Sequence, residues 1–178
     1  GGTGEIPLSI IISSDSGKTW RTTIVDKEHE LKCIRVKIIS FVNENCGYLI
    51  ATNDKSMSFE SKIIYKTNDG GNSWSKVNIK TDITGNLLYN AGFISEKLGF
   101  LTMISRDEPI IYRTEDAGTS WEEVKVELKD DMYIQLSIPY VSDNKLYLEM
   151  GVHQPDEYLN KFEESTVYES KNTGKTFY

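Results

Sequence analysis

An eight-residue phrase, Ser/Thr-x-Asp-x-Gly-x-Ser/Thr-aromatic, recurs along this chain and constrains its architecture. Its four copies run from Ser13 to Trp20, Thr67 to Trp74, Thr114 to Trp121 and Ser170 to Phe177. With first residues at 13, 67, 114 and 170, the copies begin 54, 47 and 56 residues apart, and each ends a run of β-forming residues. This is the period of a four-stranded propeller blade rather than of a helical repeat. The spacing therefore predicts an all-β tandem array.

Each fixed position of the phrase has a role in a turn. A short carboxylate accepts hydrogen bonds from backbone N–H groups about two residues further on, and a glycine supplies the positive φ that a hairpin needs. The closing aromatic is suited to fill the space between neighbouring blades. In chain order these residues are Asp15, Gly17 and Trp20; Asp69, Gly71 and Trp74; Asp116, Gly118 and Trp121; and Asn172, Gly174 and Phe177.

The phrase resembles the Asp-box, or bacterial neuraminidase repeat, of sialidases, sortilin-type receptors, some xyloglucan-active glycosidases and photosystem II assembly factors. The resemblance implies a β-propeller in which the box joins the third and fourth strands of a blade, on the face opposite the catalytic one. It therefore indicates fold strongly and activity hardly at all. The fourth box departs from the pattern at Asn172 and Phe177, and an asparagine can still form the turn without the acidity.

The segments between the boxes repeat as well, so whole blades are duplicated. Phe41 with Gly47-Tyr48-Leu49 matches Phe93 with Gly99-Phe100-Leu101. We expect one domain, 1–178, with units at about 8–25, 32–79, 87–126 and 133–178, or about three and a half blades. Open edges at both ends favour a piece of a longer propeller, with a small four-bladed ring as the alternative, and they indicate self-association through those edges. A single helical turn is expected within 155–164.

The composition of the chain limits the classes of partner and the chemical features that it can have. A formal charge of −7 argues against nucleic acid, because binding to phosphates needs clustered Lys and Arg. No apolar run approaches the ~18 residues of a membrane span. Cys33 and Cys46 flank one predicted strand, which holds them too far apart for a disulfide, so two free thiols are expected. An extracellular or cell-surface location is implied by the family resemblance alone.

Ligands of propellers usually bind at the end of the channel opposite the boxes, in the loops between strands two and three and between strands four and one. Those loops are expected at 53–60, 105–108 and 151–164, and at 26–31, 81–86 and 128–132. The longest, 151–164, combines polar groups with one aromatic that can hold a sugar or a peptide. The candidate ligand-binding residues are Arg106, Glu108, His153, Gln154, Asp156, Glu157 and Tyr158.

The sequence gives less support to a catalytic function. A sialidase needs three arginines around the substrate carboxylate. The chain has four, Arg21, Arg35, Arg106 and Arg113, but lacks the family's early Arg-Ile-Pro phrase. Lys66 occupies the position of Arg113 in the preceding unit, which marks Arg113 as a repeat position. Other glycosidases need two carboxylates across a cleft, and no pair is marked by its neighbours. The two His and two Cys lack the ligand spacing of zinc sites, and each box offers one carboxylate where calcium wants six or more oxygens. We assign no metal, cofactor or catalytic residue.

The sequence thus favours a non-catalytic binding or scaffolding propeller module that recognises a protein or glycan through the loops opposite the boxes. The alternative is a fragment of a glycoside hydrolase whose catalytic residues are not evident in these 178.

Overall fold

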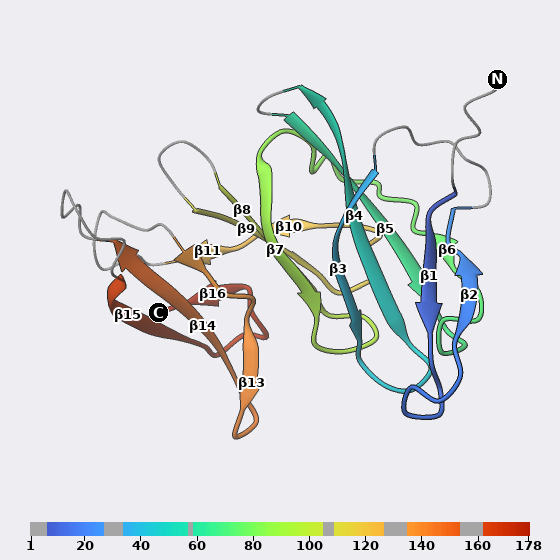
Figure 1. Ribbon diagram of the computed structural model, residues 1–178. Coiled ribbons are helices and arrows are strands. Elements are labelled where there is room, and N and C mark those ends of the chain that lie inside the picture. The colour runs from blue at the N-terminus through green and yellow to red at the C-terminus, as the bar shows by residue number, and fades with distance from the viewer. Residues whose placement is uncertain (1–6, 27–33, 57–58, 105–108, 127–134, 154–161) are drawn as a thin grey trace.

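The computed structural model describes residues 7–26, 34–56, 59–104, 109–126, 135–153 and 162–178. Within these ranges every regular element is a β-strand. The strands form sheets that follow one another in chain order, from β1 and β2 to β13–β16 (Figure 1). The all-β propeller architecture predicted from the repeat is confirmed.

The second and third blades are complete four-stranded antiparallel meanders. The second has the order β3-β4-β5-β6 and the third the order β7-β8-β9-β10. Their bounds are β3 Ile34–Phe41, β4 Gly47–Ser56, β5 Phe59–Thr67 and β6 Ser75–Lys76, then β7 Leu87–Phe93, β8 Gly99–Ile104, β9 Pro109–Thr114 and β10 Glu122–Glu123. In each blade the box joins the third strand to a fourth strand of only two residues.

The first and fourth blades depart from this plan. The first consists of β1 (Ser9–Ile12) and β2 (Arg21–Ile24), the third and fourth strands of the repeat. In the fourth, β14 (Lys145–His153) pairs with β15 (Phe162–Ser170), and its other edge pairs with two short strands, β12 (Gln135–Leu136) and β13 (Tyr140–Ser142). The sequence predicted one strand over 133–141. Pro139 lies between β12 and β13, where it has no N–H to donate to the ladder.

The last box ends in a short strand that ties two blades together. β16 (Thr176–Phe177) pairs in parallel with β11 (Lys125–Val126), which continues the outer edge of the third blade. The helical turn predicted within 155–164 is wrong for residues 162–164, which belong to β15, and its remainder lies outside the described residues. The predicted loop 53–60 is also mostly strand, because β4 extends to Ser56 and β5 begins at Phe59.

The core lies between the blades in three clusters. Leu49, Tyr65 and Trp74 pack against the first blade, next to Val25. The second cluster joins the second and third blades around Tyr48 and Phe93, whose rings stack with centroids 3.5 Å apart. The third joins the third and fourth blades around Phe100 and Phe177. The boxes lie at one end of the strands, so each sheet presents one rim of boxes and one rim of other loops.

Cys46 is a buried free thiol, as predicted, while Cys33 lies outside the described residues. The described residues contain no helix with the length and apolar character that a membrane span needs.

Candidate functional site

The first residue of each box organises the turn through its hydroxyl. Thr67 Oγ1 donates to Asp69 Oδ1 at 2.8 Å and accepts the Gly71 N–H at 2.8 Å. The same pair of bonds recurs from Ser13 and from Thr114. The hydroxyl therefore fixes both the acid and the glycine of the phrase.

The acid of each box closes the loop on the residue four positions further on. Asp69 accepts the Ser73 N–H at 2.8 Å and the Ser73 hydroxyl at 2.6 Å, and Asp15 and Asp116 do the same with Thr19 and Ser120. The sequence predicted N–H donors about two residues on, so the predicted donor was wrong while the role in the turn holds. Hydrogen bonds from Ser73 lower the pKa of Asp69 to about 2, and those from Thr19 lower the pKa of Asp15 to about 2.

The fourth box keeps this geometry with an amide. Asn172 Oδ1 accepts the N–H groups of Lys175 at 3.1 Å and Thr176 at 2.9 Å. An amide oxygen can thus replace a carboxylate in this turn, as the sequence predicted, and only the charge is lost.

The glycines of the boxes have the left-handed conformation predicted for them. Their φ angles are +84°, +82°, +90° and +84° at Gly17, Gly71, Gly118 and Gly174. At Gly71 a Cβ would also lie 2.5 Å from Ile12 Cδ1 of the first blade. This position therefore needs glycine both for the turn and for the close approach of the neighbouring blade.

The closing aromatics fill the space between blades in three of the four boxes. Trp74, Trp121 and Phe177 are buried against the blade that precedes their own. Trp20 is the exception, with 64% of its surface exposed. The prediction was wrong at Trp20 because, among the described residues, no blade precedes β1 and β2 to pack on that ring.

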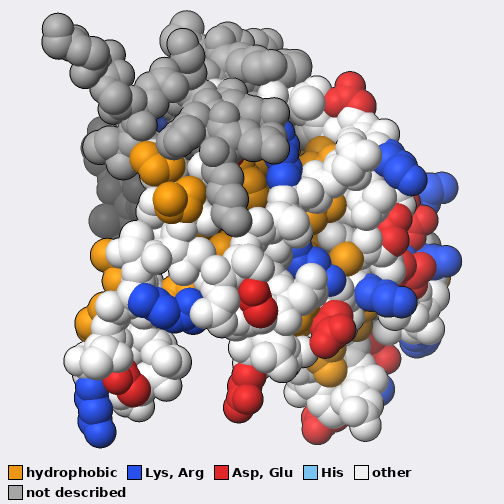
Figure 2. All heavy atoms as spheres, turned by 90° about the vertical axis from the view of Figure 1, so that its right-hand side faces the viewer, with side chains coloured by type: hydrophobic (Ala, Val, Ile, Leu, Met, Phe, Trp, Pro, Cys, Tyr) orange, Lys and Arg blue, Asp and Glu red, His pale blue; other side chains and the backbone are white. Residues whose placement is uncertain are grey.

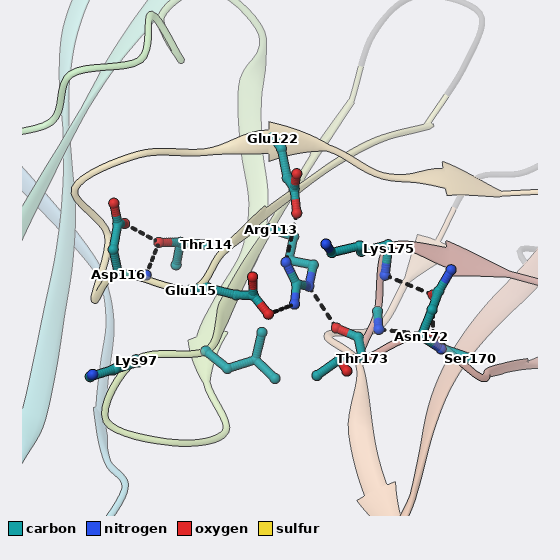
Figure 3. Close-up of polar contacts among 12 residues, drawn as sticks. Lys97, Arg113, Thr114, Glu115, Asp116, Glu122, Ser170, Asn172, Thr173 and Lys175 are labelled. Atoms are coloured by element: carbon teal, nitrogen blue, oxygen red, sulfur yellow. Dashed lines mark hydrogen bonds and ion pairs between the residues drawn. The ribbon is translucent and has the colours of Figure 1, made fainter.

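Arg113, the one arginine that the repeat marks, fastens two blades together (Figure 3). Its side chain is buried and donates to Glu122 Oε1 at 2.6 Å, to Glu115 Oε1, and to the Thr173 carbonyl of the fourth box at 2.6 Å. The guanidinium therefore bonds to partners in its own blade and in the fourth box. These bonds help to hold the two blades together.

A cleft opens on the box rim between the third and fourth blades, because the fourth blade has a shorter turn. In the second and third blades a longer turn covers the box through bonds from Gly70 N to Asn45 O and from Ala117 N to Lys97 O. The turn at 143–144 has only two residues and leaves a hollow of about 480 Å³. Its lining includes apolar Ile94, Leu98, Val141 and Leu146 and polar Asn144, Lys145, Glu169, Ser170, Lys171 and Thr173.

At the opposite rim, three charged side chains meet at the junction of the second and third blades. Glu60 and Lys62 lie near the start of β5, whose last residue, Thr67, begins the box, and Lys37 comes from the innermost strand β3. Lys37 Nζ lies 3.1 Å from Glu60 Oε1, with 31% of the lysine side chain exposed and 3% of the glutamate. We call Lys37, Glu60 and Lys62 the rim triad.

The rim triad is tied to the next blade by the backbone just before β7 and at its start. Glu60 Oε2 accepts the Leu88 N–H at 2.9 Å, and Glu60 pairs with Gly85 through backbone bonds of 2.9 and 3.3 Å. Lys62 Nζ donates to the Glu60 carbonyl at 3.1 Å and to the Asn86 carbonyl. The arrangement joins β3, β5 and the entry to β7 at one point of the rim.

Burial and bonding shift the acidities of the rim triad. Burial lowers the pKa of Lys62 to about 8, although the charge of Glu60 opposes this shift. Burial opposes the ionisation of Glu60, but the Leu88 N–H and Lys37 outweigh it and lower the pKa of that carboxyl. Glu60 is therefore a buried carboxylate at neutral pH, with Lys37 as its partly exposed partner.

The rim triad is not among the residues predicted from the sequence to bind a ligand at this rim. Of those, Arg106, Glu108, Gln154, Asp156, Glu157 and Tyr158 lie outside the described residues, and His153 ends β14 with its backbone paired to Phe162. Their role in ligand binding stays a prediction. A signal for the triad did exist, because Glu60 and Lys62 alternate on the same face of β5 as buried Ile64.

Within the described ranges, no three His, Cys, Asp or Glu side chains gather as a metal site requires. The rim triad, with two amines and one carboxylate, suits hydrogen bonding and ion pairing.

Comparison with known proteins supports the family that the boxes indicate. The sequence model of a family described as "Photosynthesis system II assembly factor YCF48" matches residues 6–129, from just before β1 to just after β11. This range holds the first three boxes and the rim triad. No curated protein matches the chain.

Proposed function

Because the chain belongs to the family of the photosystem II assembly factor YCF48, we propose that it is a non-catalytic propeller module that binds a protein partner. The partner contacts the rim opposite the boxes, around the rim triad. The proposal rests on one observation, which is that the two rims differ in what their polar side chains bond to. At the box rim the repeated phrase uses its hydroxyls and carboxylates in its own turns, and Arg113, which precedes the third box, bonds to the neighbouring blade.

The rim triad has hydrogen-bonding capacity left for a partner. An ammonium group has three donors, and one of those of Lys37 points at Glu60 Oε1. The remaining donors belong to a partly exposed side chain of the innermost strand, at the rim where propellers usually receive ligands. A carboxylate or backbone carbonyl of a partner protein suits them. The buried Glu60 keeps the lysine oriented, which lowers the entropy lost on binding.

The test compares a rim variant with a box variant. The wild-type chain, Lys37→Gln and Lys18→Gln are immobilised and exposed to an extract of the source cells, and captured proteins are identified. Both substitutions remove one exposed amine, and Lys18 lies in the first box. We expect a protein that wild type and Lys18→Gln retain and Lys37→Gln loses. Equal capture by all three chains contradicts the proposed rim.

The same wild-type chain also tests the proposal that the module is not catalytic. We expect no hydrolysis of a panel of aryl glycosides and no retention on a glycan array. Turnover that a single carboxylate substitution abolishes would instead favour the glycoside hydrolase alternative. An extracellular or cell-surface location belongs to the same proposal and is checked by fractionation of the source cells.

A further inference from the structure

The cleft between the third and fourth blades, which we call the box-rim cleft, is the place that a longer turn fills in the second and third blades. Residues 42–46 and 94–98 join the first two strands of those blades, whereas 143–144 alone join β13 to β14. Every connection that the third and fourth blades make at this rim lies within the described residues. The cleft is therefore a consequence of the short turn, with both of its walls in place.

The short turn leaves one backbone donor of the fourth box open. In the second box, Gly70 donates its N–H to Asn45 O at 2.9 Å, and in the third box the equivalent Ala117 donates to the turn at 3.1 Å. Thr173 is the equivalent residue of the fourth box and has nearly the same left-handed φ, +60° against +66° and +62°. Within the described ranges the Thr173 N–H has no hydrogen bond, and the residue is exposed on the lining of the cleft. This N–H can therefore donate to an occupant of the cleft.

The charged side chains that line the cleft leave one positive charge unpaired. Lys145 Nζ pairs with Glu169 Oε2 at 3.2 Å. Lys171 also lines the cleft and has no ion pair in the described part of the chain. An occupant with a carboxylate complements this charge. On the side of the molecule that carries β1 and β2, by contrast, acidic and basic side chains are interspersed (Figure 2), so a lysine there is a matched control.

The two turns that fill the equivalent place share a pattern, which is an acidic residue, any residue and an apolar residue. The pattern is Glu44-Asn45-Cys46 in the second blade and Glu96-Lys97-Leu98 in the third. The carbonyl of the middle residue is the one that accepts the box N–H. The apolar residue packs toward the core between the blades, since Cys46 is 3% exposed and Leu98 is partly buried. These turns show which chemistry fits beside a box.

We propose that the box-rim cleft binds a turn of a partner protein that has this acidic-any-apolar pattern. The carbonyl of the middle residue accepts the Thr173 N–H, as the chain's own turns accept from Gly70 and Ala117. The carboxylate of the acidic residue pairs with Lys171. The apolar side chain covers the apolar part of the lining, which includes Leu98, and removes it from water.

A second copy of the chain is a poor occupant of the cleft. Its turns at 42–46 and 94–98 have the pattern, but their accepting carbonyls are already bonded to their own boxes. A second copy therefore has to break those bonds before it can donate a turn. The box-rim cleft lies on the rim opposite the rim triad, so this inference goes beyond the proposed function and its test is independent.

The probe is a peptide copied from the turn of the third blade. Acetyl-Ser-Glu-Lys-Leu-Gly-amide, the sequence of residues 95–99, is titrated into the isotopically labelled 178-residue chain and followed by NMR. We expect a saturable shift of the Thr173 amide and unchanged amides at Gly70 and Ala117, which are already bonded. A wild-type chain whose Thr173 amide does not shift would contradict the proposal.

The charge pair is tested from both sides. Lys171→Gln should weaken binding of the peptide about threefold, as should a peptide with glutamine in place of its glutamate. The two changes together should weaken it little more than either alone, because both remove the same ion pair. Lys18→Gln removes an exposed lysine of the first box and should bind the peptide like wild type. Unchanged affinity in Lys171→Gln overturns the proposed contact.

A second variant fills the cleft. Replacing 143–144 by Ser-Glu-Lys, the sequence of residues 95–97, makes this turn as long as those of the second and third blades. It should abolish binding of the peptide and slow the hydrogen exchange of the Thr173 amide. Equal binding to this variant and to wild type overturns the proposal. So does slow exchange of Thr173 in the free wild-type chain, because the chain then fills its own cleft, or protection that grows with chain concentration, because a second copy is then the occupant.

Discussion

Replacing two tryptophans of the same repeat position by alanine should have different costs. Trp74 is 6% exposed and Trp20 is 64% exposed, although both close a box. Trp74 packs edge to face on Phe41 at 6.1 Å and lies against the first blade. Truncation of a buried Trp to Ala costs about 3–5 kcal/mol, so Trp74→Ala should lose that much. Scaling the same range by the buried fraction of Trp20 gives about 1–2 kcal/mol for Trp20→Ala.

Urea unfolding monitored by circular dichroism measures the difference. Both variants should keep the slope of the wild-type transition, and the midpoint should fall two to three times further for Trp74→Ala. Equal losses in the two variants would refute the reasoning, because they would mean that Trp20 is packed as Trp74 is.

Three further results follow from the boxes and the rim triad. The pKa of Asp69 is lowered from 3.8 to about 2, so its carboxylate stabilises the fold above about pH 4. This stability is lost as the pH falls toward 2. Urea titrations from pH 6 to 2 should therefore show a smaller loss of stability for Asp69→Asn than for the wild type. The pKa of Lys62 is lowered from 10.5 to about 8, so between these pH values the unfolded chain binds a proton that the folded chain does not. The free energy of unfolding should therefore rise from pH 8 to 10.5, and Lys62→Met should remove that rise in the same titrations. A rise that persists in the variant would assign it to another group. Gly71→Ala should destabilise the fold by about 2–3 kcal/mol in thermal melts, and Gly85→Ala by about 1 kcal/mol. Both glycines have positive φ, but only at Gly71 does the new Cβ meet another side chain, that of Ile12. Equal costs would show that Ile12 moves aside.

The fold could be predicted because its signal is local. Each box carries its hydroxyl, acid, glycine and aromatic within eight residues, and these residues form the turn largely among themselves. Their spacing then fixes the length of a blade. The split between β12 and β13 was within reach of the same reasoning, since Pro139 cannot donate to a ladder.

The rim triad could not be predicted in the same way. Lys37 and Glu60 meet across 23 positions of sequence, and the bonds that tie Glu60 to the next blade come from Gly85 and Leu88. The exposure of Trp20 likewise depends on which blade lies next to it, not on the box that contains it. Local phrases determined the turns, whereas burial was decided by neighbours distant in the chain.

The proposed partner protein binds the rim opposite the boxes, and hydrogen exchange can locate its contact. Exchange is measured for the chain free and in complex with the captured partner. We expect slower exchange in the complex at residues 35–38, 60–63 and 85–89, and unchanged exchange in the boxes at 67–74 and 114–121. Protection of the boxes with unchanged exchange around Lys37 and Glu60 would contradict it.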